Sequence, residues 1–333
     1  MNKRKYLGVG LVAFLALMVT ACGAKTETTA PTNAQSTAAT SGDSQKASES
    51  ATGETRTVKY LDQEYKIPAK TERIVITGSM ESMEDAVVLG VQPVGAISVG
   101  GKFPDIFASI TGSAESIGEK MQPNMETILK LKPDVILGSS KFKPEVYEKF
   151  GKIAPTFPVS HISSNWEANL HLLAELTGKQ AEAENELKKY KESVVAAKAS
   201  LGDKLKDKKV VAIRLRQGNI NIYPEKVFFN PSLYAELGFT APAEVKAAKA
   251  QEIVSLEKFS EINPDYIFVQ FSPDENKDQP KYLEDMEKNP IWQSMSAVKN
   301  GHVYVNVVDP LAQGGTAWSK INFLKAAVEK LSK

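Results

Sequence analysis

The sequence is poor in the residues that build disulfide frameworks and metal centres: its 333 residues include one cysteine and three histidines. A single cysteine cannot form an intrachain disulfide, even where the compartment permits one. His161, His171 and His302 show no pair at ligand spacing. A site for bare zinc or manganese, which would need a His and carboxylate cluster, is therefore not expected.

The sequence also lacks the motifs of common catalytic sites and a strong excess of either charge. It contains no Gly-Lys-Ser/Thr phosphate loop and no nucleophile elbow, so we do not expect an enzyme. The formal net charge is +1. Removing residues 1–21, which hold Lys3, Arg4 and Lys5, takes it to about −2. Nucleic acid is therefore a poor candidate partner.

The amino-terminal segment "MNKRKYLGVGLVAFLALMVTAC" has a basic start, an apolar run and then small residues. This order is typical of a secretory signal, and the apolar run is short for a membrane span. We expect residues 1–21 to be a signal peptide. "VTAC" resembles the lipobox of bacterial lipoproteins, which implies a lipid attached to Cys22. Residues 22–57 are rich in Thr, Ser, Ala and Gln and are predicted to be a disordered tether.

Apolar strand-like runs alternate with helical patterns from residue 58 onward, as in "RIVITG", "SMEDAVVLG", "PVGAIS" and "PDVILGSS". This alternation is typical of an α/β fold with mostly parallel strands. The chain also repeats itself, because "METILKLKPDVI" matches "LEKFSEINPDYI" 131 residues later. In each copy a capping residue, Asn124 or Ser255, precedes a short helix. We therefore predict two related lobes, residues 58–165 and 203–333.

Residues 166–202 are predicted to be a helical segment that connects the two lobes. Leu170, Leu173 and Leu176 recur at helical spacing before Gly178, which we expect to interrupt the helix. One helix of about twenty residues, about 30 Å long, should follow Lys179. The expected fold is two Rossmann-like α/β lobes joined by one long α-helix, with a cleft between the lobes.

The stretch "VVAIRLRQGN" places two arginines on the same side of a predicted strand. Side chains alternate along a strand, so Arg214 and Arg216 should face away from Ile213 and Leu215. Charges inside a parallel strand are costly. Both arginines are therefore expected at its carboxyl end, the edge where open α/β sheets bind ligands.

Lysines of both lobes occupy corresponding positions. Lys141 follows "PDVILGSS", while Lys120 lies six residues before Glu126 and Lys249 eight residues before Glu257. Taken singly, each lysine is equally well interpreted as a solvated surface residue. Together with the arginines, they predict a cleft that is lined by cationic side chains from both lobes.

From about residue 58 to its end, the chain resembles the solute-binding lipoproteins of ABC importers for ferric siderophores and vitamin B12. The resemblance rests on the repeated unit, the single connector, the lipobox and the closing "NPIWQSMSAVKNGHVYVN". Within that family, "SIGEKMQPN", "GSSKF", "RLRQG" and "KAAKAQ" are most similar to binders of ferric triscatecholates such as bacillibactin and enterobactin. The resemblance implies a class III solute-binding fold, no intrinsic cofactor, and iron held by the siderophore.

The resemblance implies a trianionic ligand in a basic cleft. The ligand-binding cations that it implies are Lys120, Lys141, Arg214, Arg216 and Lys249. Gln217 and Gln251 are expected to be neutral donors beside them, and Lys143 and Lys246 are nearby alternatives. Phe142, Tyr223, Phe271 and Trp318 either line the cleft or pack in the core.

Two features at helix amino ends allow two interpretations each. Glu126 and Glu257 lie in the first turns of their helices, where the helix dipole favours a carboxylate by about 0.3 to 1 kcal/mol. The resemblance implies a second role, in which both pair with arginines of the membrane permease. Ser79, in "TGSMES", is either a simple cap or part of a helix end that attracts an anion.

The sequence is compatible with other ligands and with one other role. The same fold accommodates a hydroxamate or citrate siderophore or haem, and charge alone does not separate catecholate from citrate. A surface sensing protein without a transport role is a further alternative. We expect a monomer that the lipid holds at the extracellular face of the cell membrane.

Overall fold

The computed structural model describes residues 53–202 and 207–332. The predicted signal peptide, the lipid attachment at Cys22 and most of the tether lie outside the described residues. Within the described part of the chain, no helix combines the length and the apolar composition needed to cross a bilayer.

The N-terminal lobe begins with an antiparallel hairpin, β1 (Thr55–Tyr60) and β2 (Gln63–Pro68), and continues as one sheet. The strands of that sheet are β3 (Ile74–Thr77), β4 (Gly95–Ser98), β5 (Glu115–Glu119), β6 (Gln122–Pro123), β7 (Val135–Ser139) and β8 (Thr156–Val159). They lie in the order β6-β5-β4-β3-β7-β8, and all neighbours pair in parallel except β5 with β6.

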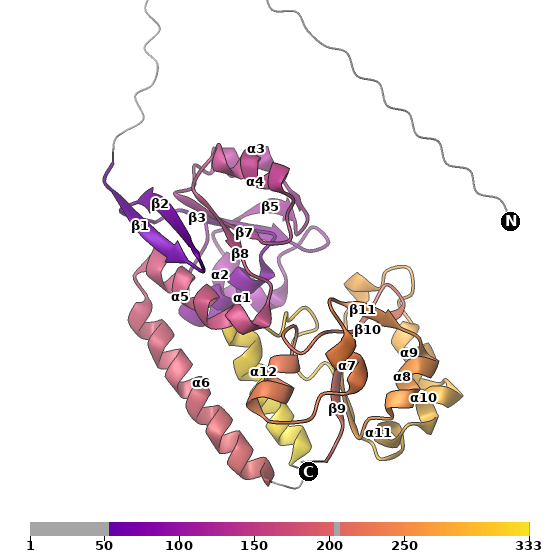
Figure 1. The fold of residues 1–333 in the computed structure, drawn as a ribbon. Helices are drawn as coiled ribbons and strands as arrows, with labels where there is room; N and C mark the ends of the chain where they lie inside the picture. The colour runs from indigo at the N-terminus through magenta and orange to yellow at the C-terminus, as the bar shows by residue number, and fades with distance from the viewer. Residues whose placement is uncertain (1–52, 203–206, 333) are drawn as a thin grey trace, which may run out of the picture. The chain divides into compact units, whose positions relative to one another are not determined.

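Helices connect the strands of this lobe (Figure 1). They are α1 (Met80–Leu89), η1 (Asp105–Phe107), α2 (Ala108–Thr111), α3 (Met125–Lys130), α4 (Pro144–Gly151) and η2 (Ser163–Asn165). The chain adds β4 and β5 on one side of β3 and then β7 and β8 on the other. In an open α/β sheet, the crevice at such a reversal is the usual ligand site.

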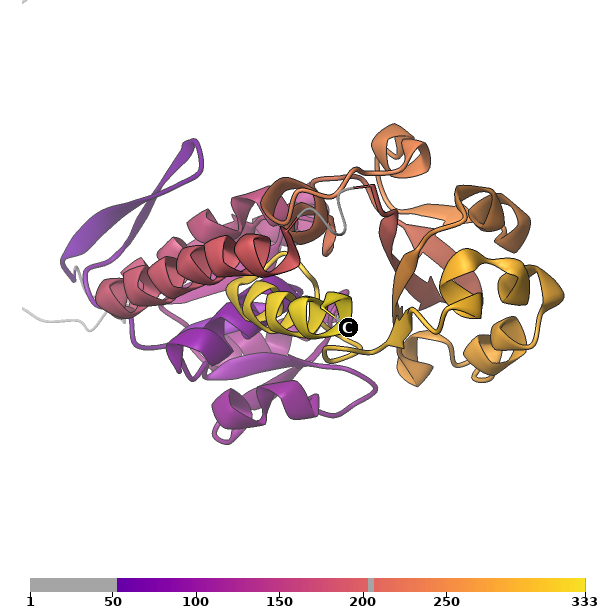
Figure 2. The same cartoon turned by 90° about the horizontal axis from the view of Figure 1, so that it is seen from below.

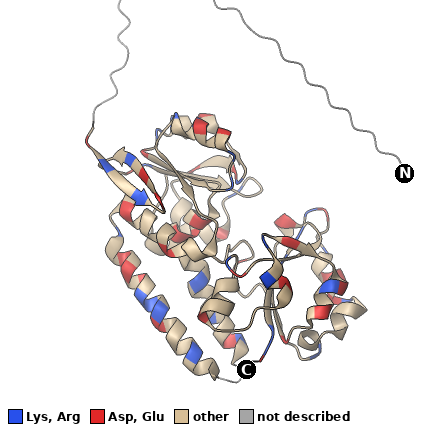
Figure 3. Ribbon diagram, in the orientation of Figure 1, with Lys and Arg blue, Asp and Glu red and all other residues tan. Residues whose placement is uncertain are grey.

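The connecting segment forms two helices, α5 (Trp166–Thr177) and α6 (Gln180–Leu201). Gly178 ends α5 in the left-handed conformation, with φ of 70°, which glycine adopts without a Cβ clash. The predicted long helix after Lys179 is therefore confirmed, and α6 has 22 residues. Charges of both signs alternate along it (Figure 3), as expected for a helix with a solvated face.

The C-terminal lobe has a sheet in the order β11-β10-β9-β12-β13. Its strands are β9 (Val210–Arg216), β10 (Asn219–Ile222), β11 (Glu252–Val254), β12 (Tyr266–Phe271) and β13 (Val303–Val305). β9, β12 and β13 pair in parallel, and β10 and β11 complete an antiparallel edge. Its helical elements are η4 (Pro231–Glu236), α7 (Ala243–Ala247), α8 (Leu256–Ile262), η5 (Pro273–Glu275), α9 (Tyr282–Glu287), α10 (Pro290–Ser294), α11 (Ser296–Lys299) and α12 (Ala317–Leu331).

The sequence repeat corresponds to equivalent structures in the two lobes. Asn124 and Ser255 cap α3 and α8 through their side chains, as predicted. Asp134 precedes β7 and accepts the backbone N–H of Arg73, ahead of β3, at 2.7 Å. Asp265 precedes β12 and accepts the N–H of Lys209, ahead of β9, at 2.9 Å. Each aspartate thus ties the start of its own strand to the start of the neighbouring strand.

The last helix, α12, lies beside α6 and packs into the cores of both lobes (Figures 1 and 2). Phe323 and Leu331 join the C-terminal core, while Leu324 joins the N-terminal core. Two buried carboxylates of α1 hold its amino end: Glu84 accepts from Thr316 Oγ1 at 2.5 Å, and Asp85 accepts from the backbone of Ala317. The junction between the lobes therefore consists of α12 together with the connector.

Candidate functional site: a charged cavity between the two lobes

A cavity lies where the carboxyl ends of strands from both lobes meet, as the fold predicts. Its charged lining residues are Glu81, Lys120, Lys141, Arg214, Arg216 and Glu275. Its other lining residues are His161, Tyr223, Val227, Phe228, Gln251 and Gln313. Four cationic and two anionic side chains face one space, which leaves a net excess of two positive charges.

Lys120 and Lys141 enter the cavity from the N-terminal lobe. Lys120 follows β5, and its Nζ donates to Gln313 Oε1 at 3.1 Å. Burial, together with the neighbouring charges of Lys141 and Arg214, lowers the pKa of Lys120 to about 8. Lys141 follows β7 and is exposed. No ion pair of either ammonium group is found in the described chain, so both remain available to an anion.

Arg214 and Arg216 are the last residues of β9 on the cavity side, while Ile213 and Leu215 pack in the core. The predicted alternation is therefore confirmed. The two guanidinium groups differ in environment, because the Arg214 side chain is 6% exposed and that of Arg216 is 38% exposed. Arg214 is thus part of the wall, whereas Arg216 reaches into the opening.

Glu275, in η5 after β12, bridges the two arginines. Its Oε2 lies 2.8 Å from Arg214 Nε, and its Oε1 lies 3.3 Å from Arg216 Nε. The backbone N–H of Gln217 donates to the carbonyl of Glu275 at 3.0 Å, and Asn276 donates to the carbonyl of Leu215. These bonds fasten the loop to the end of β9 and hold both guanidinium groups in place.

Neutral side chains complete the wall beside the arginines. Gln251 accepts from Arg216 at 3.2 Å and from the Tyr223 hydroxyl at 3.2 Å. His161 follows β8, and its Nδ1 lies 2.8 Å from Ser140 Oγ. Burial and the nearby Lys141 lower the pKa of His161, so the imidazole is neutral at pH 7.

Some predicted site residues lie away from the cavity lining. Gln217 and Lys249 are exposed and line none of it. Lys143 is exposed at the start of α4, and Lys246 lines a different hollow. Gln217 and Lys249 therefore stay predictions.

Of the four aromatic residues, Tyr223 lines the cavity. Phe142 packs against Tyr147 and Phe150. Phe271 is buried in the core of the C-terminal lobe, and Trp318 packs against that core. For these last three, the core interpretation holds.

Sequence reasoning missed four polar cavity residues, Glu81, His161, Glu275 and Gln313, and also the apolar Val227 and Phe228. Glu81, His161 and Glu275 follow the carboxyl ends of strands, and this position could have identified them. An argument based on cationic side chains alone does not select them. Gln313 precedes α12 and enters the cavity because that helix is anchored on α1, which no local pattern predicts.

The amino end of α1 is already occupied by the protein's own groups. Ser79 accepts from the backbone N–H of Ser82 at 3.1 Å and contacts the Ser82 hydroxyl. Glu81 lies in the first turn and is buried. Ser79 is therefore a cap, and the negative charge at this helix end belongs to the protein.

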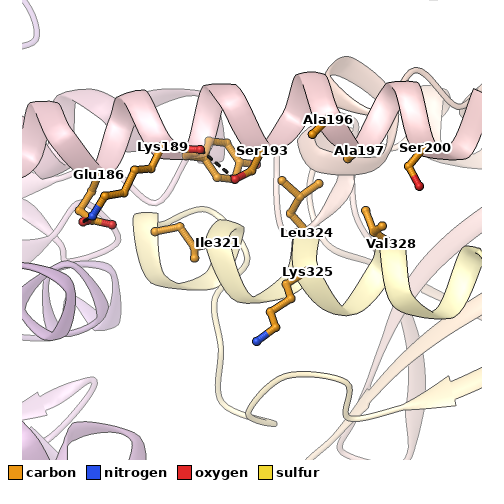
Figure 4. Close-up of a pocket in the computed structure, with 11 residues that line it drawn as sticks. Glu186, Lys189, Ser193, Ala196, Ala197, Ser200, Ile321, Leu324, Lys325 and Val328 are labelled. Carbon is orange, nitrogen blue, oxygen red and sulfur yellow. Dashed lines mark hydrogen bonds and ion pairs between the residues drawn. The ribbon is translucent and has the colours of Figure 1, made fainter.

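A second hollow lies between α6 and α12 and is lined mainly by apolar side chains such as Leu324 and Val328 (Figure 4). Its two lysines are Lys189, which pairs with Glu186 at 2.7 Å, and Lys325, which points away from α6 in this view. It offers no convergent charge for an ionic ligand. In the described residues, no cluster of three or more His, Cys, Asp or Glu side chains is suited to a metal ion.

Glu126 and Glu257 occupy matching positions: each is the second residue of its helix, α3 or α8. Both side chains are exposed. Glu126 lies 3.5 Å from Lys130 on the next turn. Bonds from its own backbone N–H and from Ser255 lower the pKa of Glu257.

Two lobes joined by a long helix, with a polar cavity between the carboxyl ends of their strands, define a binding protein for a small solute. The chain belongs to the periplasmic binding protein family, whose model matches residues 84–306. The members of this family that it resembles are named as binding proteins.

Two relatives from Bacillus subtilis (strain 168) extend this assignment. The chain is 56% identical to the iron-uptake system-binding protein over 322 residues, which cover 97% of each chain. It is 29% identical to the probable siderophore-binding lipoprotein YfiY over 302 residues, covering 87% of this chain and 90% of that one.

Solved structures agree with these relatives. The triscatecholate siderophore binding protein FeuA from Bacillus subtilis, complexed with ferri-bacillibactin, has a TM-score of 0.81 and 60% identity, covering 83% of this chain and 98% of that one. Staphylococcus aureus SirA, complexed with staphyloferrin B, has a TM-score of 0.70 and 29% identity, covering 83% and 98%. The predicted class III fold is thereby confirmed.

Proposed function

We propose that this chain captures a ferric triscatecholate siderophore, of the bacillibactin or enterobactin type, and delivers it to an ABC permease for iron uptake. The observation that carries the proposal is the convergence of four cations from two lobes on one cavity. The likeness to a relative solved with ferri-bacillibactin supports the ligand class. The role is one of binding and delivery and includes no catalytic step.

The chemistry of the ligand matches the cavity. Iron(III) held by three catecholates is a trianion whose oxygens accept hydrogen bonds. Arginine forks and lysine ammonium groups donate to such oxygens, and each charge-assisted bond contributes about 1.5 to 3 kcal/mol. A few of them account for affinities in the micromolar to nanomolar range.

The environments of the cations suggest different roles. Lys120, Lys141 and Arg216 have donors free for the ligand, and Gln251 lies beside Arg216. Arg214 is buried against Glu275 and positions the end of β9. Gln217 and Lys249, which are exposed outside the cavity lining, join the proposed set through closure of the lobes on the ligand.

Permease docking is assigned to Glu126 and Glu257, the exposed glutamates of α3 and α8. Within four residues of each glutamate in the sequence, a large apolar side chain is exposed: Leu129 is 59% exposed on α3, and Ile253 is 65% exposed ahead of α8. Each lobe thus presents an exposed carboxylate and an exposed apolar side chain in one short segment, a combination suited to a partner that carries arginines. A lipid on Cys22 would hold the monomer at the extracellular face of the membrane.

The test is a titration of the protein from Gly23 onward, followed by intrinsic fluorescence. The ligands are ferric bacillibactin, ferric enterobactin, ferric citrate and a neutral ferric trihydroxamate. We expect saturable binding of both triscatecholates at micromolar concentration or below. Absence of a saturable change with them, together with clear binding of the trihydroxamate, would overturn the ligand class. Preferential binding of ferric citrate would assign the cavity to that ligand instead.

A further inference from the structure

Glu81 is a buried carboxylate in a cavity that is otherwise suited to anions. It is 4% exposed and lines the cavity, and its Oε2 is buried without a hydrogen-bond partner. An unsatisfied buried carboxylate oxygen is costly. The cost indicates that Glu81 has a role in the cavity and is not there to stabilise the fold.

The location of Glu81 also indicates a role in ligand binding. It lies in the first turn of α1, directly after the central strand β3, at the crevice where the order of the strands reverses. A helix amino end at this place would ordinarily favour an anionic ligand. Here the protein brings its own negative charge to the helix end, so an incoming anion meets a repulsive group there.

The two carboxylates of the cavity differ in their pairing. Glu275 forms ion pairs with both arginines, which neutralise its charge locally. Glu81 forms no ion pair within 4 Å in the described chain. Its charge nevertheless acts to raise the pKa of Lys120 and of His161, against the lowering effect of burial. The field of Glu81 therefore extends across the cavity instead of ending on one partner.

We propose that Glu81 is a specificity-determining residue that sets how steeply the affinity of the cavity rises with the negative charge of the ligand. This inference rests on the proposed function. The carboxylate repels every anionic complex, and the repulsion grows with each unit of ligand charge. With a net excess of two positive charges, the cavity binds a trianion. Its affinity stays below the level at which release to a permease would be slow.

The test compares two complexes of one ligand that differ in charge and hardly in shape. Enterobactin binds gallium(III) as a trianion and germanium(IV) as a dianion, and both ions have a filled d shell. The quantity measured is the ratio of the two affinities, gallium to germanium. One unit of ligand charge about 10 Å from a removed carboxylate, at a dielectric between those of protein and water, changes affinity roughly fivefold. Glu81→Gln should therefore raise the ratio roughly fivefold.

A matched control is Glu145→Gln. Glu145 also lies in the first turn of a helix of the same lobe, but it is exposed and outside the cavity lining. This variant loses the same charge, and the ratio should stay at the value of the unchanged protein. Glu81→Asp keeps the charge, so its ratio should also stay close to that value. It serves as the folded comparison if Glu81→Gln has a lower thermal midpoint.

The outcomes separate this inference from the proposed function. If the unchanged protein binds neither complex, the proposed function fails and the inference fails with it. If it binds both and Glu81→Gln leaves the ratio unaltered, the inference alone is overturned. Weaker binding of both complexes by Glu81→Gln would also overturn it, because the carboxylate would then be accepting a bond from the ligand. A changed ratio in Glu81→Asp contradicts it as well.

Discussion

The two arginines of β9 are expected to respond differently to the same substitution. Arg216→Gln removes a guanidinium that is 38% exposed and has donors facing the cavity, whereas Arg214→Gln removes one that is 6% exposed and lies 2.8 Å from Glu275. We predict that Arg216→Gln weakens ligand binding and spares the fold. Arg214→Gln should destabilise the fold.

The magnitudes follow from these environments. Loss of one charge-assisted bond to the ligand costs about 1.5 to 3 kcal/mol, so Arg216→Gln should lower affinity roughly 10- to 150-fold. Breaking a buried ion pair costs about 3 to 5 kcal/mol. Arg216 stays within reach of Glu275 in the Arg214→Gln variant, so the lower part of that range, about 3 kcal/mol, applies to the free energy of unfolding.

Two assays on each variant separate the two effects. Fluorescence titration with ferric bacillibactin gives the affinity, and denaturant unfolding without ligand gives the free energy of unfolding. The reasoning is refuted if Arg216→Gln binds with unchanged affinity. It is equally refuted if Arg214→Gln unfolds at the same denaturant concentration as the unchanged protein.

Three further predictions follow from the charged groups. Burial raises the pKa of Glu84 to about 7 from its usual 4.5. Between these two pH values the folded state retains a proton that the unfolded state has lost. The free energy of unfolding therefore falls as the pH rises from about 4.5 to about 7. Glu84→Gln should remove about 3 kcal/mol of this dependence in unfolding measured from pH 4 to 8. Because the pKa of Lys120 is about 8, affinity for ferric bacillibactin should fall between pH 7 and 9. Lys120→Met should bind more weakly at pH 7 and lose this pH dependence in stepped titrations. The double variant Glu126→Ala and Glu257→Ala should bind ligand normally but abolish uptake of radiolabelled iron in cells, and surviving uptake would contradict the docking assignment.

Local patterns predicted much of the fold and one side of the site. The repeat located α3 with β7 and α8 with β12, and the spacing of apolar residues located the connector. Alternation in β9 gave the direction of Arg214 and Arg216. These features depend on residues close in sequence, or on a strand whose environment the fold class determines.

The rest depends on contacts between distant segments. Gln313 reaches Lys120 only because Glu84 anchors α12 to the N-terminal lobe, a contact across more than 200 residues. The different roles of Arg214, which is buried, and Arg216, which is partly exposed, depend on Glu275, which pairs with both and which η5 places at the end of β9. Charge counting predicts that cations gather, but it does not predict which carboxylates join them.

The measurement that tests the central claim most directly is the affinity for ferric bacillibactin of a variant lacking three available cations. It combines Lys120→Gln, Lys141→Gln and Arg216→Gln and is compared with the unchanged protein. With about 1.5 to 3 kcal/mol lost at each position, affinity should fall roughly 1000-fold or more, while the thermal midpoint without ligand changes little. Binding within tenfold of the unchanged protein would contradict capture of the ferric complex by the cations of this cavity.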